Sequence, residues 1–111
     1  MAEITDEYMQ SEIANIKVYA LCLLHKGPAY GSEGSEKIIW EHGRNNFKLR
    51  EAGKLCVMGP IPGDSELRGT GIFSTSVEEA TAIMEADPAI QAGIFTFEIY
   101  PFRSFPGSTL P

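Results

Sequence analysis

The sequence has little positive charge and no long apolar run. Its 9 Lys and Arg residues stand against 15 Asp and Glu residues, which gives a net charge of −6. No basic stripe is present that would release counterions from a nucleic acid or hold an anionic membrane surface. The longest apolar run, residues 18–24, is too short to span a bilayer. We therefore expect neither a nucleic-acid partner nor a membrane partner.

Cysteine is also scarce, and the common signatures of metal and nucleotide sites are missing. Cys22 and Cys56 are the 2 cysteines, they form no CxxC pair, and both fall in strand-like apolar stretches. Buried neutral thiols are the expected outcome, which fits a reducing cytoplasm. HExxH, GxGxxG, a phosphate-binding loop and GxSxG are all absent. The sequence thus predicts no metal, nucleotide or flavin cofactor.

A chain of 111 residues has room for one domain, and its acidity is concentrated at one end. Residues 1–16 contain four acidic residues and no Lys or Arg, and they lack the basic start and apolar stretch of a secretory signal. Ile4, Tyr8 and Ile13 recur at helical spacing. We expect an acidic extension over 1–16, a domain over 17–103 and a tail over 104–111. Deleting the extension should leave the domain folded and dimeric.

The rest of the chain alternates between strand and helix patterns. Strands are expected over 17–25, 55–59, 69–75 and 94–102. A helix over 36–52 would have Ser35 as its N-cap and Gly53 after its end, and a capping box at Ser76 would begin the next helix, which should end near Asp87. The order β-α-β-β-α-β predicts an α+β, ferredoxin-like fold, in which an antiparallel four-stranded sheet carries two helices on one face.

That arrangement leaves the other face of the sheet uncovered. The first strand is nevertheless apolar on both faces, with Cys22 and Leu24 on one and Leu21 and Leu23 on the other. A strand that is apolar on both faces needs cover on both. We therefore expect a homodimer in which two sheets pack face to face through their open faces.

His42 and Asp87 are the main candidates for chemistry. His42 follows Ile38 by four positions and Ile39 by three, which turns its imidazole towards the sheet. It is either a core histidine satisfied by one hydrogen bond or a general acid/base at the base of a pocket. Asp87 is either a helix stop that caps the next turn or a carboxylate that orients a histidine tautomer.

Two further residues are candidates for ligand binding. Arg68 lies in the connection between the central strands, where it is either a surface arginine or a bidentate partner for a ligand carboxylate. His25, at the end of the first strand, is either a solvated strand end or a residue at the mouth of the pocket.

The order of motifs resembles the YCII-related family of the dimeric α+β barrel superfamily. His42 lies on the first helix, Gly59-Pro60 ends the following strand, and residues 86–93 read ADPAIQAG before a strand that closes in Tyr-Pro-Phe. The resemblance covers residues 17–103 and implies a homodimer with a His–Asp pair, here His42 and Asp87, lining a pocket. Most members have no assigned reaction; one group eliminates chloride from a chlorinated hydroxyhydroquinone, and the superfamily includes muconolactone isomerase. The 16-residue extension departs from the family pattern.

Together these features predict a cytoplasmic protein that acts on an unknown small molecule. The leading hypothesis is a cofactor-independent lyase, isomerase or dehydrochlorinase, in which the His–Asp pair transfers a proton on a small organic acid or an oxygenated ring. The first alternative is a module that binds a small ligand without turnover. The second is a structural dimer, which predicts a cavity filled by side chains such as Trp40 and Phe97.

Overall fold

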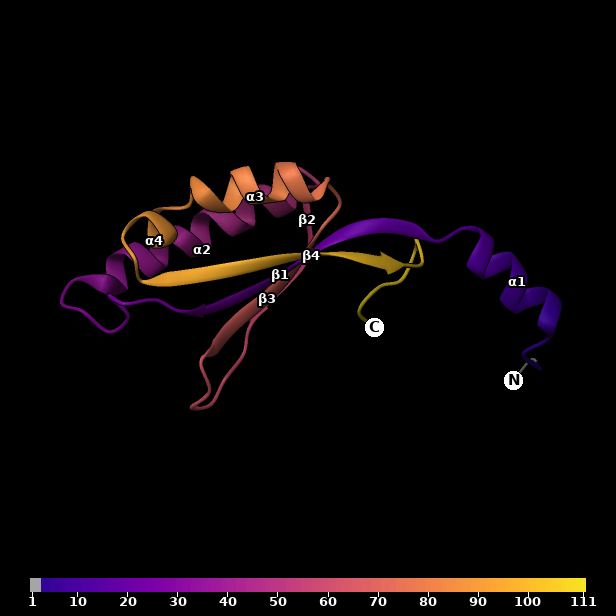
Figure 1. Ribbon diagram of the computed structural model, residues 1–111, viewed down its shortest axis with the longest axis horizontal. Helices are drawn as coiled ribbons and strands as arrows, with labels where there is room; N and C mark the ends of the chain where they lie inside the picture. The colour runs from indigo at the N-terminus through magenta and orange to yellow at the C-terminus, as the bar shows by residue number, and fades with distance from the viewer. Residues whose placement is uncertain (1–2) are drawn as a thin grey trace.

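Four apolar segments form one antiparallel sheet. In the computed structural model, which describes residues 3–111, they are β1 (Lys17–Lys26), β2 (Leu55–Pro60), β3 (Leu67–Phe73) and β4 (Phe95–Ser104) (Figure 1). The order across the sheet is β2-β3-β1-β4. β1 is therefore flanked on both sides, and Leu24 lies opposite Gly69 of β3 and Phe97 of β4.

Three helices cover one face of this sheet. They are α2 (Ser35–Glu51), α3 (Val77–Glu85) and the single turn α4 (Pro88–Gln91), whereas α1 (Asp6–Ala14) lies beyond one end of the sheet (Figure 1). After α1 the order is β-α-β-β-α-β with α4 added before the last strand, which confirms the α+β, ferredoxin-like arrangement. No helix within residues 3–111 is long and apolar enough to cross a membrane.

Glycines set both ends of α2. The helix begins at Ser35, and the residue before it, Gly34, has a φ of 81° and makes no side-chain cap. The prediction that Ser35 caps the helix was wrong, because Gly34 turns the chain through a left-handed conformation that glycine adopts without strain. At the other end the expected role of Gly53 is confirmed. Its φ is 74°, and its N–H donates to the carbonyl of Arg50.

Polar side chains set the start of α3 and of α4. Ser76 Oγ accepts the N–H of Glu79 at 3.0 Å, as the capping box predicts, while the Glu79 carboxylate lies 3.2 Å from Lys54 Nζ. Asp87 is the N-cap of α4 and Pro88 is its first residue. A proline fits at this position because the N–H groups of the first helical turn have no acceptor within the helix. Proline, which has no N–H, therefore loses no hydrogen bond there.

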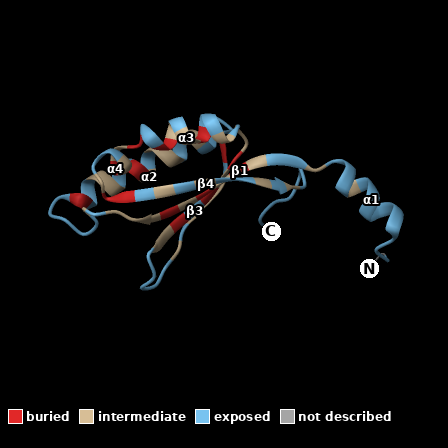
Figure 2. Cartoon of the chain, viewed as in Figure 1, coloured by how far each residue is buried: buried red, intermediate tan, exposed pale blue. Residues whose placement is uncertain are grey.

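The core lies between the helices and the sheet, where alternate residues of each strand are buried (Figure 2). On β1 these residues are Ala20, Cys22 and Leu24. Cys56 was also predicted to be buried, and it is exposed. The pairing of β2 with β3 shifts between Leu55 and Val57, so Cys56 is the extra residue of an irregularity that interrupts the alternation.

The opposite face of the sheet carries apolar side chains without a covering helix. Leu21 and Leu23 of β1 lie on it and are half-buried, and the register places Leu21 between Ile72 of β3 and Tyr100 of β4. Tyr100 is 46% exposed. The apolar character of both faces of β1, expected from the sequence, is therefore present in the folded chain.

Helix α1 buries none of its residues, although its side chains include Tyr8, Met9 and Ile13. Thr5 caps it by accepting the N–H of Tyr8 at 3.1 Å, and Asn15 and Ile16 connect it to β1.

We expect a chain that lacks residues 1–16 to fold at low protein concentration. Its free energy of unfolding should differ from that of the full chain by less than about 1 kcal/mol, because surface segments that bury nothing contribute little to stability. Circular dichroism and chemical denaturation measure this. Loss of the cooperative transition would show that α1 is part of the core.

Candidate functional site

His42 lies on the face of α2 that packs against the sheet. Its side chain is buried, and its ring packs against Phe95 at the start of β4, with 5.3 Å between the ring centroids. The expected direction of this side chain, towards the sheet, is therefore observed. An apolar ring beside the imidazole keeps water from one side of it and limits its rotation.

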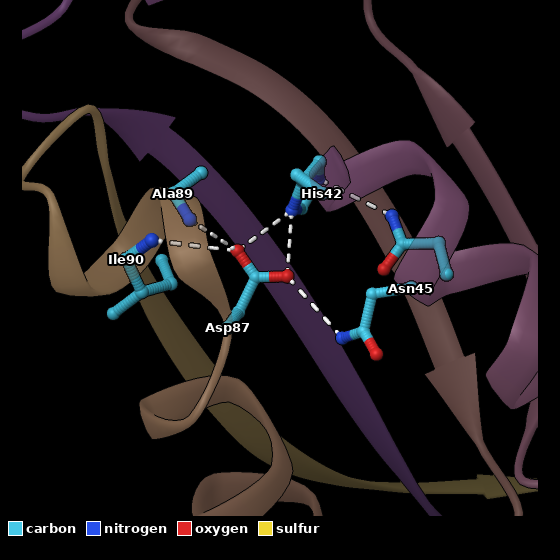
Figure 3. Close-up of polar contacts among 6 residues, drawn as sticks. His42, Asn45, Asp87, Ala89 and Ile90 are labelled. Atoms are coloured by element: carbon cyan, nitrogen blue, oxygen red, sulfur yellow. Dashed lines mark hydrogen bonds and ion pairs between the residues drawn. The ribbon is translucent and has the colours of Figure 1, made fainter. Parts of the chain in front are cut away.

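Asp87 joins α2 to the start of α4 at one carboxylate. His42 Nδ1 lies 2.9 Å from each of its oxygens, and the Ala89 N–H donates to Oδ2 at 2.9 Å (Figure 3). Longer contacts of 3.4 Å come from the Ile90 N–H and from Asn45 Nδ2. Asp87 is only 1% exposed. The same side chain thus caps α4 and holds a histidine ring, so the two interpretations of Asp87 describe one geometry.

These contacts keep the Asp87 carboxylate ionised. Burial by itself raises the pKa of Asp87. The hydrogen bond and charge of His42 and the N–H groups of Ala89 and Ile90 outweigh that effect, and they leave the pKa lowered from its ordinary value of 3.8. The site therefore contains a fixed negative charge at neutral pH, directly behind the imidazole.

The charge of Asp87 also fixes the tautomer of His42. A carboxylate only accepts hydrogen bonds, so Nδ1 carries the proton that faces it. In the neutral ring Nε2 is then an acceptor, and the Asn46 amide donates to it at 3.2 Å. Asn46 lies four residues after His42, one turn further along α2. The basic nitrogen of the pair therefore lies beside Asn46.

His42 and Asn46 both line a cavity of about 320 Å³ between α2 and the sheet. Most of the other lining residues are apolar, including Leu24, Ile39, Leu55, Met58, Phe73, Met84 and Phe95. Gly69 and Gly71 of β3 contribute no side chains to the lining. A Cβ on Gly71 would lie 3.0 Å from Leu55 Cδ1, so a larger residue there would take up space within the cavity. The cavity is therefore mostly apolar, with His42, Asn46, Arg68 and Thr70 as the polar residues of its lining.

Cys22 also lines the cavity, and its environment makes it unreactive. Burial, with a smaller contribution from the negative charge of Asp87, raises the pKa of Cys22 to about 12. The thiol is therefore protonated at neutral pH and is not a nucleophile. Within residues 3–111, no three His, Cys, Asp or Glu side chains gather closely enough to hold a metal ion.

Arg68 lines the cavity as well, but most of its guanidinium is used by its own loop. Nε donates to the carbonyl of Leu67 at 2.8 Å, and Nη2 donates to the carbonyls of Gly63 and Ser65 at 2.6 and 2.9 Å. The guanidinium also lies 5.9 Å from the ring centroid of Tyr30. Arg68 therefore holds the β2–β3 connection in shape while it borders the cavity.

The structure separates His25 from His42. His25 points to the open face of the sheet and is not among the residues that line the cavity. Its Nε2 lies 2.5 Å from a carboxylate oxygen of Glu98, and the Tyr100 hydroxyl donates to the other oxygen. These bonds, first from Tyr100 and then from His25, lower the pKa of Glu98. A pocket-mouth role for His25 has no support in this placement.

Sequence reasoning missed the two asparagines that complete the site. Asn45 and Asn46 follow His42 by three and four positions, and residues at these separations share a helix face. That spacing was the available signal. Glu98 and Tyr100 are two positions apart on one strand and therefore share a face of the sheet, so their spacing was also an available signal.

The lowered pKa of Asp87 predicts a dependence of stability on pH. The native state holds this carboxylate ionised more firmly than the unfolded chain does, so the ionised carboxylate stabilises the fold. This contribution to the free energy of unfolding is complete above about pH 5. It is lost as the pH falls through about 4, where the unfolded chain takes up the proton, and then through the lower pKa of the native state. We expect Asp87→Asn to lower the free energy of unfolding by about 1 to 3 kcal/mol at pH 7 and to flatten its decline in acid. Urea denaturation from pH 7 down to pH 3 measures both. Asp64→Asn, at an exposed loop position, is the control and should keep the wild-type slope. An equal acid slope in Asp87→Asn would contradict the assignment.

Comparisons with known proteins give few matches. No model of a known protein family matches the chain, and no curated protein matches it, so the resemblance to the YCII-related family stays a prediction. Among solved structures, the methylated RPA0582 protein is 15% identical, with 96% of each chain covered and a TM-score of 0.39. The RPA0582 protein of unknown function from Rhodopseudomonas palustris is 18% identical over 96% of this chain and 97% of that one, with a TM-score of 0.36. Likenesses at this level assign neither a family nor a function to the chain.

Proposed function

We propose that this protein is a cofactor-independent enzyme that transfers a proton on a small organic acid or an oxygenated ring, by way of His42. The observation that carries the proposal is the buried pair of His42 and Asp87, in which His42 lines a mostly apolar cavity. A histidine held by a carboxylate in this way is the arrangement that general acid/base catalysis uses.

Each group of the pair has a separate task in this mechanism. His42 Nε2 takes a proton from a carbon or oxygen of the substrate, and Asp87 stabilises the imidazolium that results. In a lyase or dehydrochlorinase, the electron pair of the broken C–H bond forms a double bond while the leaving group departs with its own pair. In an isomerase, the same proton returns to a different carbon. General acid/base catalysis of this kind contributes about 100- to 10,000-fold to a rate.

Asn46 must rearrange during that cycle. In the neutral site its amide NH₂ donates to the lone pair of His42 Nε2. The substrate therefore displaces this bond before Nε2 can act as a base. Once Nε2 is protonated, rotation of the amide lets its oxygen accept the new N–H.

The cavity favours a substrate about the size of one ring. Its volume of about 320 Å³ lies at the lower end of the range for small-molecule sites. Apolar walls suit the carbon skeleton, and Arg68 Nη1 is the remaining guanidinium nitrogen that could meet a ligand carboxylate.

A site that binds the same kind of molecule without turnover is the second candidate. The bond from Asn46 to His42 favours it, because a capped Nε2 is already satisfied. The third hypothesis, a structural dimer with a filled cavity, made a wrong prediction. Trp40 is 71% exposed and does not line the cavity, and neither does Phe97.

The working unit in this proposal is a homodimer formed through the open face of the sheet. Support comes from the apolar side chains of that face, among them Leu21, Leu23 and Ile72, which no helix of the chain covers. A second copy would bury them and would leave the cavity, on the other face, accessible. Both cysteines are unpaired and Cys56 is exposed, which supports a location in a reducing cytoplasm.

Replacing His42 separates turnover from binding. A thermal-shift screen of small carboxylates and phenols identifies a ligand first. We expect His42→Gln to lower turnover of that ligand at least about 100-fold, because glutamine cannot carry the proton, while the dissociation constant changes only a few-fold. Glu78→Gln, at an exposed position of α3 outside the cavity, is the control and should keep wild-type activity. Full turnover by His42→Gln would exclude the mechanism, and binding without turnover by the wild type would favour the second candidate.

A charge on the open face tests the homodimer. We expect Leu23→Asp to halve the mass of the particle in solution, measured by light scattering, because an uncompensated carboxylate would be buried between the sheets. Leu110→Asp, in the exposed tail, makes the same change as a control and should keep the wild-type mass. A wild-type particle of 12.2 kDa, the mass of one chain, would refute the dimer.

A further inference from the structure

Two apolar surfaces of this chain have no partner, and they complement each other. The first is the arm, residues 3–16, which exposes Ile4 before α1 and Tyr8, Met9 and Ile13 on it. An isolated helix of nine residues is marginally stable in water. Its apolar side chains therefore need a surface to pack on, and in the single chain they have none.

The second surface is a groove of about 420 Å³ along the outer side of α2, which we call the α2 groove. It is lined by Glu36, Ile39, Trp40, Gly43, Arg44 and Phe47. Trp40 and Phe47 are 71% and 55% exposed. A Cβ placed on Gly43 would meet nothing within 4 Å, so there is space between the two aromatic side chains for a residue of another helix.

The arm is acidic, and the end of α2 next to the groove is net basic. The arm contains Glu3, Asp6, Glu7 and Glu12 with no basic residue. On α2, residues 44–51 contain Arg44, Lys48 and Arg50 with one acidic residue, Glu51, and Arg44 is paired with Glu41 at 2.9 Å. The arm's acidic residues are concentrated towards its start, and the basic residues of α2 lie towards the end of that helix. An antiparallel alignment brings the two groups together.

We propose that the arm of one chain docks in the α2 groove of a second copy, with α1 antiparallel to α2. Glu7 then lies beside Lys48, and Ile13 lies towards Trp40. The connection of α1 to β1 is only Asn15 and Ile16, and Figure 1 shows α1 extending beyond the end of the sheet, away from the middle of α2. This short tether favours docking on another chain over docking on its own.

A docked arm would also lie next to the cavity that His42 lines. Ile39, Gly43 and Phe47 line both the groove and the cavity, so the two spaces are neighbours along α2. An arm in the groove covers these three residues from outside. The proposal uses only the geometry of α2 and does not depend on any reaction at His42.

Trp40 is the single tryptophan of the chain, so tryptophan fluorescence reports whether the groove is occupied. With the full chain, we expect the emission to shift to the blue and acrylamide quenching to fall as the protein concentration rises. Ile13→Asp should weaken this association by about tenfold or more, because it removes one buried aliphatic side chain. Leu110→Asp, at an exposed site in the tail, makes the same kind of change as a control and should behave as wild type.

A charge swap tests the antiparallel alignment. Lys48→Glu should weaken the association about two- to five-fold, and combining it with Glu7→Lys should restore it. Lys54→Glu, beyond the end of α2, is the control for the change in charge. Trp40 emission that stays exposed at every concentration would overturn the proposal. Protection that does not depend on concentration would also overturn it, since it would place the arm in the groove of its own chain. Leu23→Asp should leave the Trp40 response intact, which separates this contact from the one between sheets.

Discussion

The buried carboxylate of Asp87 is the constraint on which the site depends. A carboxylate that is 1% exposed must have its charge satisfied by hydrogen bonds, because an unpaired buried charge is strongly destabilising. The Ala89 N–H at the start of α4 and the ring N–H of His42 on α2 meet this requirement. One side chain therefore fixes the break between α3 and α4, the angle of the imidazole and the tautomer that leaves Nε2 basic. Neighbouring Asn45 and Asn46 complete the polar network on the same helix.

The surroundings of this pair decide which chemistry is available. Apolar walls lower the local dielectric constant, so the charge of Asp87 acts strongly on its neighbours. That charge adds to the burial of Cys22 and keeps its thiol protonated. Gly69 and Gly71 leave room for a ligand that larger residues of β3 would occupy. The proposed proton transfer uses the imidazole of His42, which lines this cavity.

The single chain leaves three surfaces uncovered, and they differ in character. The open face of the sheet combines leucines with the polar cluster of His25, Glu98 and Tyr100. The arm is acidic and apolar, and the α2 groove is aromatic with basic residues beyond it. Different chemistry on each surface allows two separate contacts between copies, one between sheets and one between an arm and a helix. In the proposed assembly, the cavity would lie between these two contacts and next to the one between arm and helix.

The sequence alone determined the elements, the ferredoxin-like order and the inward direction of His42, because local signals such as alternation, capping residues and helical spacing act over a few positions. It also supplied both interpretations of Asp87 without choosing between them. Tertiary structure decided the rest. The contact between His42 and Asp87 joins residues 45 positions apart, so no local pattern specifies it. The exposure of Cys56 follows from a shift in strand pairing, and the use of Arg68 by its own loop follows from the path of the backbone. The separation of His25 from the cavity depends on which face of the sheet the helices cover, and packing of the whole chain decides that.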